Sequence, residues 1–307
     1  MQFSKRITTI RYSIFLVFLC SGLTAHAQLN PLADSYYQNQ YLSNPALAGS
    51  TNVLKVNLGL RQQWSDIPGA PKTQSLTAAY GSTGKVGLGL SVQNEETGLI
   101  KRTAAKGTYA YHLPLNDGSQ KLHFGVSLGF SDDRLMSGMI EGLPNDVAIS
   151  RFNERKIYLD GDFGLAYTSD RLSIQAAIPN TKIFFKKDNS ETAADLATFY
   201  AAVSYKVFFP DALDGSALEP KIAFRGVNNF DHIIDAGANF TLANNALNVM
   251  AMYHSTKSTT LGLGVNVKSF GTLTAAYTSS TAELQGYTNG YFQVGVQLNF
   301  FGQKSLN

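Results

Sequence analysis

The last regular stretch of this chain limits its possible folds more than any other. Residues 290–301 read GYFQVGVQLNFF, and apolar residues occupy every second position. Successive side chains of a β-strand point to opposite faces, so one face of this strand is apolar and the other is polar or bare. An ordinary amphipathic strand of a soluble sandwich has the same pattern, so this stretch alone favours a membrane strand without deciding for it.

The same stretch carries a second pattern, a polar residue followed by Gly and two apolar residues at fixed spacing. It is similar to the β-signal that the outer-membrane assembly machinery reads at the end of a barrel. We therefore expect an assembly signal in the last strand. Its residues are Gln293, Gly295, Leu298 and Phe300.

Alternation of apolar and polar residues recurs along the whole chain from Val53 onward. In residues 122–130, for example, leucine, phenylalanine and valine alternate with His, Gly and Ser. An even number of such segments, about 14, is typical of outer-membrane barrels. The sequence thus predicts an all-β fold, a transmembrane outer-membrane β-barrel of about 14 antiparallel strands. The expected strands are 53–64, 73–81, 85–94, 103–113, 120–130, 156–168, 171–179, 198–208, 218–227, 233–242, 246–255, 259–268, 270–279 and 288–301.

The connections between these strands tend to alternate in length. The second, sixth, tenth and twelfth are tight, whereas the first, third, fifth, seventh and thirteenth are longer. The longest are 131–155 and 180–197, and the eighth, 209–217, is longer than its position suggests. Outer-membrane barrels have short periplasmic turns and longer external loops, so a periplasmic N-terminus would put every odd connection outside.

The N-terminus has the three parts of a secretory leader. Lys5, Arg6 and Arg11 precede a short apolar run, and Ala25-His26-Ala27 forms a small-x-small cleavage site. We expect cleavage after Ala27, which gives an exported chain divided into a leader at 1–27, an irregular segment at 28–50 and a barrel at 51–307. The apolar run is too short for a transmembrane helix.

Charge and cysteine content say little about partners. Removing the leader takes three of the 25 basic residues, which leaves 22 to match the 22 acidic ones, so a basic balance is no argument for nucleic acid. Cys20 is the only cysteine and lies in the leader, so the mature chain is expected to be stable without disulfides.

Residues 28–50 follow neither a strand period nor a helix period. Pro31 and Pro45 interrupt the stretch, and Tyr36, Tyr37 and Tyr41 are its bulky side chains. An ordered, irregular segment in the periplasm or the barrel mouth and a flexible tail both fit this composition. Whether the lumen is open, plugged by these residues or filled by a partner stays open.

The polar face of the predicted strands contains glycine, small polar residues and charges. On the lipid face at mid-depth each charge would cost a few kcal/mol, so we expect these side chains to line the lumen. The charged residues on this face are Lys55, Arg61, Lys106, Asp160, Asp162, Lys206, Lys221, Arg225 and Asp235.

No motif points to catalysis or to a metal. The four histidines of the mature chain form no HxxxH or HxH pair, and the GxSxG run at 125–129 lies inside an expected strand rather than at the strand-to-helix turn of a nucleophile elbow. Asp160-x-Asp162 is explained more simply by two lumen-facing residues of one strand than by a pair of catalytic carboxylates. We therefore expect no enzyme and no cofactor.

Two motifs at the first predicted hairpin resemble the PorP/SprF family of outer-membrane proteins. They are RQQW at 61–64 and IPGAPKT at 67–73, and NPALAG at 44–49, VGLGLSVQN at 86–94 and YAYHLPL at 109–115 are also similar. The start at Gln28-Leu29-Asn30-Pro31 departs from the Gln-Asp-Pro-like start expected of the family. The family-motif residues that are candidates for partner contact are Tyr36, Tyr41, Asn44, Pro45, Trp64, Pro68, Gly69 and Pro71.

This resemblance implies a role in the type IX secretion system of gliding, adhesin-exporting bacteria. The implied partners are a secreted adhesin with a C-terminal sorting domain, the periplasmic ring and lipoprotein subunits of the system, and outer-membrane lipid. External loops or the lumen would hold the sorting domain. The alternatives are a general porin or small-solute transporter with the same architecture, and an outer-membrane enzyme such as a lipase or protease.

Overall fold

The computed structural model describes residues 36–81, 85–116, 118–136, 153, 157–181, 197–210, 215–227, 232–267 and 271–300. The leader, and most of the two longest expected loops, lie outside these residues. Within the described residues no helix is both long and apolar enough to cross a membrane. The strands are β1 (Leu54–Gln63), β2 (Lys72–Gly81), β3 (Val86–Thr97), β4 (Ile100–Leu115), β5 (Gln120–Leu135), β6 (Tyr158–Thr168), β7 (Leu172–Ile178), β8 (Ala197–Tyr205), β9 (Val207–Phe209), β10 (Ser216–Val227), β11 (Ile233–Leu242), β12 (Leu247–His254), β13 (Thr259–Val267), β14 (Gly271–Thr278) and β15 (Tyr291–Phe300).

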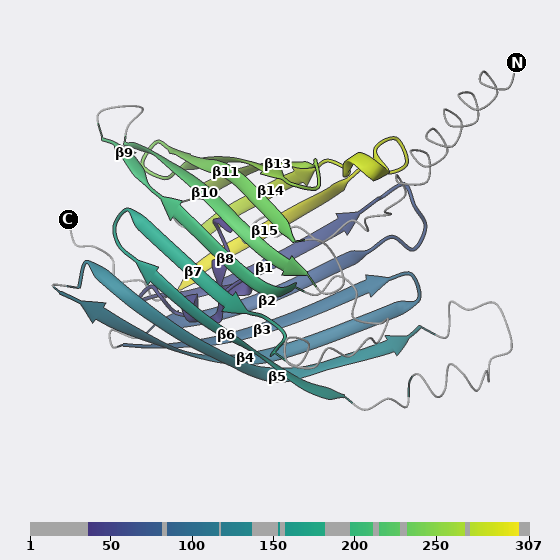
Figure 1. The fold of residues 1–307 in the computed structure, drawn as a ribbon, viewed down its shortest axis with the longest axis horizontal. Helices are drawn as coiled ribbons and strands as arrows, with labels where there is room; N and C mark the ends of the chain where they lie inside the picture. Colours follow the sequence, from purple (N-terminus) through teal and green to yellow (C-terminus); the bar gives the residue numbers. More distant parts are fainter. Residues whose placement is uncertain are drawn as a thin grey trace, which may run out of the picture.

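These strands form one antiparallel sheet that closes on itself (Figure 1). The closing ladder joins the first and last strands, from Leu54 opposite Phe300 to Gln63 opposite Tyr291. β8 and β9 pair with β10 in one register and form a single strand, interrupted opposite Pro220, which has no N–H to give to the ladder. The fold is therefore a closed 14-stranded antiparallel β-barrel, as the sequence predicted.

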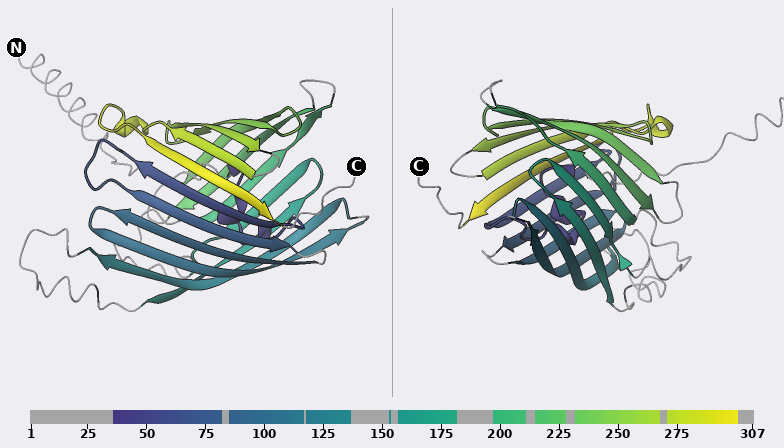
Figure 2. Two further views of the ribbon diagram at one scale, coloured as in Figure 1. Left: turned by 180° about the vertical axis from the view of Figure 1, so that it is seen from behind. Right: turned by 60° about the vertical axis from the view of Figure 1, so that its left-hand side comes forward.

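The two faces of the barrel wall differ as the alternation predicted. Outward side chains are large and apolar, such as Leu128 and Leu159, which are 67% and 72% exposed. Many inward side chains are small or polar, such as Thr77 and Thr260, which are completely buried, and a few larger ones such as Tyr200 and Met252 are buried beside them. Figure 2 shows the steep tilt of the strands around the ring. The charges expected on the inner face include Lys221, which is buried, so the lumen is the polar side.

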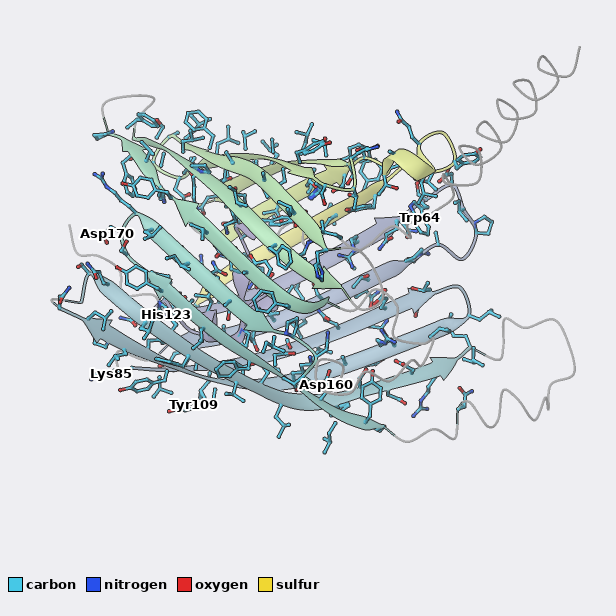
Figure 3. All side chains as sticks on the ribbon, viewed as in Figure 1. Trp64, Lys85, Tyr109, His123, Asp160 and Asp170 are labelled. Carbon is cyan, nitrogen blue, oxygen red and sulfur yellow. The ribbon has the colours of Figure 1, made fainter. Side chains whose placement is uncertain are left out.

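The two ends of the barrel are distinct. At the turn end, β1 begins, β15 ends, and the connections after β2, β6 and β11 are short. At the loop end, the connections after β1 and β14 are longer, and the first of these begins at Trp64. Figure 3 shows Lys85 and Asp170 at the turn end and Trp64 at the loop end.

The third connection is shorter than the sequence predicted. Only Gly98 and Leu99 separate β3 from β4, because both strands continue past their apolar alternation. The added part of β4 carries ion pairs, Lys101 to Glu96 of β3 at 3.2 Å and Arg102 to Asp133 of β5 at 2.8 Å. Charged pairs suit strands that extend beyond the lipid, so the hairpin grows without the pattern that marks a membrane strand.

A charge at mid-depth on the outer wall should destabilise the barrel far more than the same charge near a strand end. We expect Leu263→Arg, in the middle of β13, to lower the free energy of unfolding by about 2–4 kcal/mol, and Val267→Arg, at its end, by about 0–1 kcal/mol. Urea titration of the protein in lipid vesicles measures both values. Equal losses would contradict the assignment of β13 to the membrane.

Candidate functional site

The barrel interior is occupied by the N-terminal part of the chain itself. Residues 36–50, called the lumen segment below, lie inside the ring of strands, where Figures 1 and 2 show them in purple. Two short 3-10 helices, η2 (Gln40–Leu42) and η3 (Pro45–Leu47), give the segment its irregular path. Tyr36, Asn44 and Ala46 are completely buried, so this part of the expected irregular segment is ordered and packed.

Asn44 fixes the segment to itself and to the wall. Its side-chain oxygen accepts a hydrogen bond from the Ala46 N–H at 3.0 Å and so caps η3. Its amide nitrogen donates to the Leu165 carbonyl of β6 at 3.0 Å. One side chain therefore sets both the helical turn and its position in the lumen.

Glycines on the inner wall make room for this turn. A methyl group on Gly125 would overlap the backbone of Pro45 and Ala46, and one on Gly164 would overlap the Asn44 side chain. The lumen segment is what these inward glycines pack against. Any larger residue at these positions displaces the segment.

Tyr36 anchors the segment to a buried charge cluster. Its hydroxyl donates to Asp235 at 2.7 Å, and its carbonyl accepts a hydrogen bond from the Lys221 ammonium. Arg225 donates to both oxygens of Asp235, at 2.7 and 3.0 Å, and the Nδ1–H of His254 donates at 2.7 Å. The carboxylate thus receives four hydrogen bonds, which compensates its removal from water.

Three further contacts join the lumen segment to other strands of the barrel. Asn39 donates to Thr77 of β2 at 3.1 Å, and the Tyr41 hydroxyl lies 2.7 Å from the Thr108 hydroxyl of β4. Farther around the ring, Gln175 of β7 donates to the Gln40 side chain, and Tyr36 reaches Asp235 of β11. The segment therefore crosses the lumen and binds strands on both sides of it.

A histidine pair holds the turn-end part of the segment. His112 Nε2 lies 3.1 Å from the Ala48 carbonyl and must donate to it, because a carbonyl only accepts. His112 Nδ1 is then the acceptor for His123 Nδ1–H at 2.7 Å, and His123 Nε2 accepts from Thr168 at 2.7 Å. Both rings are neutral in this chain of hydrogen bonds, and each has one fixed tautomer.

A lysine of the lumen lies between two carboxylates. Lys106 lies 2.6 Å from Asp162 and 3.9 Å from Asp160, so the two carboxylates share a cation. Among the residues that the structure describes, no group of His, Cys, Asp and Glu could hold a metal ion.

At the loop end, the motif between β1 and β2 is tied to its neighbours. Trp64, with a left-handed φ of 41°, begins the loop and donates its N–H to the Gly290 carbonyl at 2.8 Å. The Gly69 carbonyl accepts from the Gly98 N–H at 2.8 Å. Pro68 and Gly69 are exposed and Pro71 is buried. The first, third and last connections thus form one surface.

That surface, called the loop platform below, exposes large apolar side chains outside the barrel wall. Ile67 is 39% exposed, Leu99 40% and Tyr287 78%. The platform is reinforced by Asn289, whose side chain accepts from the Ser65 N–H at 3.1 Å and donates to the Ser65 hydroxyl at 2.7 Å. Apolar groups on a rigid exposed surface are typical of protein-binding sites.

The predicted site residues therefore separate into three places. Tyr36, Tyr41, Asn44 and Pro45 lie in the lumen, and the Trp64–Pro71 group lies at the loop end. In β15, Gln293 and Gly295 face the lumen, whereas Phe300 is 42% exposed. Their role as an assembly signal stays a prediction. The cluster around Asp235 was not predicted from the sequence. The alternation shows that its charged side chains face the lumen, but it does not show which residues lie opposite one another on neighbouring strands.

Expelling the lumen segment should open the barrel to ions. We expect Gly125→Ala to displace Pro45 and Ala46, because the added methyl group has no room, and to raise single-channel conductance in planar bilayers. Gly107→Ala is the matched control, since its added methyl group would meet nothing closer than 4.0 Å. Identical conductance in the Gly125 variant and wild type would contradict the plugging role.

Alkaline titration should show that the phenol of Tyr36 is buried. Burial raises its pKa well above the ordinary value of 10.0, and it raises the pKa values of Tyr37 and Tyr41 as well. A raised pKa means that the folded protein favours the neutral phenol. The burial of these tyrosines therefore stabilises the folded state below pH 10, and this contribution is lost as the pH rises above 10. We expect Tyr36→Phe to remove one late-titrating phenol from the tyrosinate absorbance curve. An unchanged late step would contradict the burial of this ring.

Comparison with known proteins places the chain in a family. Among solved structures it is similar to the outer membrane protein Omp33 of Acinetobacter baumannii (9% identity, TM-score 0.44, covering 81% of this chain and 98% of that one). It is also similar to a mutant porin of Rhodopseudomonas blastica (11%, 0.35, 81% and 99%) and to the KdgM porin (8%, 0.36, 80% and 99%). These likenesses are too distant to bear on function.

No curated protein matches the chain. The family model described as "Type IX secretion system membrane protein PorP/SprF" matches residues 25–298, which is most of the sequence. The chain therefore belongs to the PorP/SprF family of type IX secretion system membrane proteins.

Proposed function

We propose that this outer-membrane barrel binds secreted adhesins through their C-terminal sorting domain and helps to export or anchor them. The observation that carries the proposal is the loop platform, a rigid apolar surface at one end of a barrel that belongs to a secretion family. Its motif residues Trp64, Pro68 and Gly69 build the surface, and Ile67 and Tyr287 supply exposed contact area. The proposal involves no catalysis and no cofactor.

The lengths of most connections support one orientation of the barrel. Short turns of outer-membrane barrels face the periplasm and longer loops face outward. The turn end then faces the periplasmic ring and lipoprotein subunits of the secretion system, and the platform faces outward. A leader cleaved after Ala27 would deliver the chain to the periplasm, and residues 28–50 would enter the barrel from that compartment's side of the membrane.

The alternative, a general porin, fits the interior less well. A porin needs a water-filled channel, whereas the lumen segment crosses this lumen and is held by Asn44, Tyr36 and Tyr41. The packing of Gly125 and Gly164 against it supports a resident plug. A role in which the barrel presents a surface to a protein agrees with a filled interior.

The test is site-specific photo-crosslinking in cells that secrete adhesins. A photoreactive phenylalanine analogue at Ile67 or at Tyr287 should crosslink to a large secreted protein, identified by mass spectrometry as carrying a C-terminal sorting domain. The same analogue at Lys85, at the turn end, is the matched control and should capture no adhesin.

A variant with Ile67→Asp and Tyr287→Asp should lose adhesin in an affinity pull-down, because charge replaces the apolar contact area. Lys72→Asp with Lys257→Asp, which lie at the same end of the barrel, should retain it. Recovery of the barrel alone, from membranes where adhesins are abundant, would reject adhesin binding and favour the porin.

A further inference from the structure

A polar cavity of about 290 Å³ lies at the turn end, between the lumen segment and the barrel wall. Tyr37, Gln40 and Thr51 form its inner side. Its outer side comes from β1, from the β6–β7 turn and from the strand formed by β8 and β9. The cavity approaches the size range of small-ligand sites, which begins at roughly 300 Å³.

Three cations from different parts of the wall line this cavity, namely Lys55, Arg171 and Lys206. Within the part of the chain that the structure describes, none of the three forms an ion pair. Lys206 instead lies 5.2 Å from the centroid of the Phe208 ring. Two other cations of the lumen do form ion pairs, Arg225 with Asp235 at 2.7 Å and Lys106 with Asp162 at 2.6 Å.

Two acidic residues also line the cavity. Glu219 already accepts a hydrogen bond from the Ser204 hydroxyl at 2.7 Å, and Asp170 lies in the β6–β7 turn next to Arg171. The cavity therefore has three cations against two carboxylates and is suited to one additional negative group. A highly charged polyanion would meet the two carboxylates and be disfavoured.

The uncharged lining adds both donors and acceptors of hydrogen bonds. Gln38 presents an amide and Ser50 a hydroxyl. Other polar groups of this lining are already hydrogen-bonded, Gln40 to Gln175 and Tyr37, Asn57 to Thr77, and Ser173 to Gln175. Amides satisfy the N–H and the C=O of a peptide backbone equally well. A single small anion would leave the Gln38 amide and the Ser50 hydroxyl unused, whereas an extended peptide would use both.

We propose that the turn-end cavity binds an extended peptide segment through one carboxylate, which Lys55, Arg171 and Lys206 surround. The segment would come from a partner in the periplasm, and an acidic side chain or a free C-terminus supplies the same carboxylate chemistry. This site lies at the opposite end of the barrel from the platform proposed to bind adhesins. The two proposals therefore fail independently.

The experiment measures binding of a defined peptide to the purified mature protein in nanodiscs. The probe is a fluorescein-labelled peptide, Gly-Ser-Thr-Glu-Thr-Ser-Gly, amidated at its C-terminus, and its counterpart has Gln in place of Glu. Fluorescence anisotropy should give a Kd for the Glu peptide at least about tenfold lower than for the Gln peptide, the size of effect expected of one well-placed charge pair. A version with Gln and a free C-terminal carboxylate tests the second source of the anion.

Removing the three cations should abolish this preference. In Lys55→Gln/Arg171→Gln/Lys206→Gln the two peptides should bind alike. The matched control Lys72→Gln/Lys101→Gln/Lys257→Gln removes the same charge from the loop end and should bind as wild type does. Both variants are shown to be folded if heating changes their mobility on a gel, as it does for a folded barrel.

The single variants Lys55→Gln and Lys55→Arg decide the matter if the triple variant does not fold. The first should reduce the preference for the Glu peptide at least about threefold, and the second should restore it because the charge returns. Equal binding of all three peptides to wild type, or an unchanged preference for the carboxylate-bearing peptide in the Lys55→Gln variant, would overturn the proposal.

Discussion

The closing ladder between β1 and β15 is the interaction on which the rest of the molecule depends. A backbone N–H or C=O that faces lipid without a partner costs several kcal/mol, and an open sheet would leave two rows of them. Pairing Leu54 with Phe300 and continuing to Gln63 and Tyr291 removes both edges. Closure then fixes which side chains meet lipid and which surround the lumen.

The polar side chains on the inner wall of a closed barrel need hydrogen-bond partners, and the lumen segment supplies many of them here. Asp235 is completely buried yet accepts from Tyr36, Arg225 and His254, because partners from the segment and from the wall converge on it. In the low dielectric of such a site, complete pairing gives a rigid arrangement, and a missing partner is costly. The NPALAG stretch at 44–49 packs against Gly125 and Gly164 of the inner wall.

Much of the fold could be predicted because alternation is a local property. Counting alternate positions along each strand predicted that Lys106 and Arg225 face inward and that Leu263 faces outward. The length of the β3–β4 hairpin was underestimated, because its added residues form ion pairs and lack the apolar alternation that marked the strands. The seat of Asn44 against Gly164 was not predictable, because it joins residues that only the closed ring brings together.

The position of the lumen segment also sets an order for assembly. Residues 36–50 precede β1 directly, yet their partners include Thr77 of β2, Leu165 of β6 and Asp235 of β11. Contacts so far apart in the chain form only after long loops have closed, which makes them late and entropically costly. A segment wrapped on all sides is most simply enclosed while the first and last strands are still apart. The seam between β1 and β15 then becomes the final step, made around a core that the chain supplies from its own beginning.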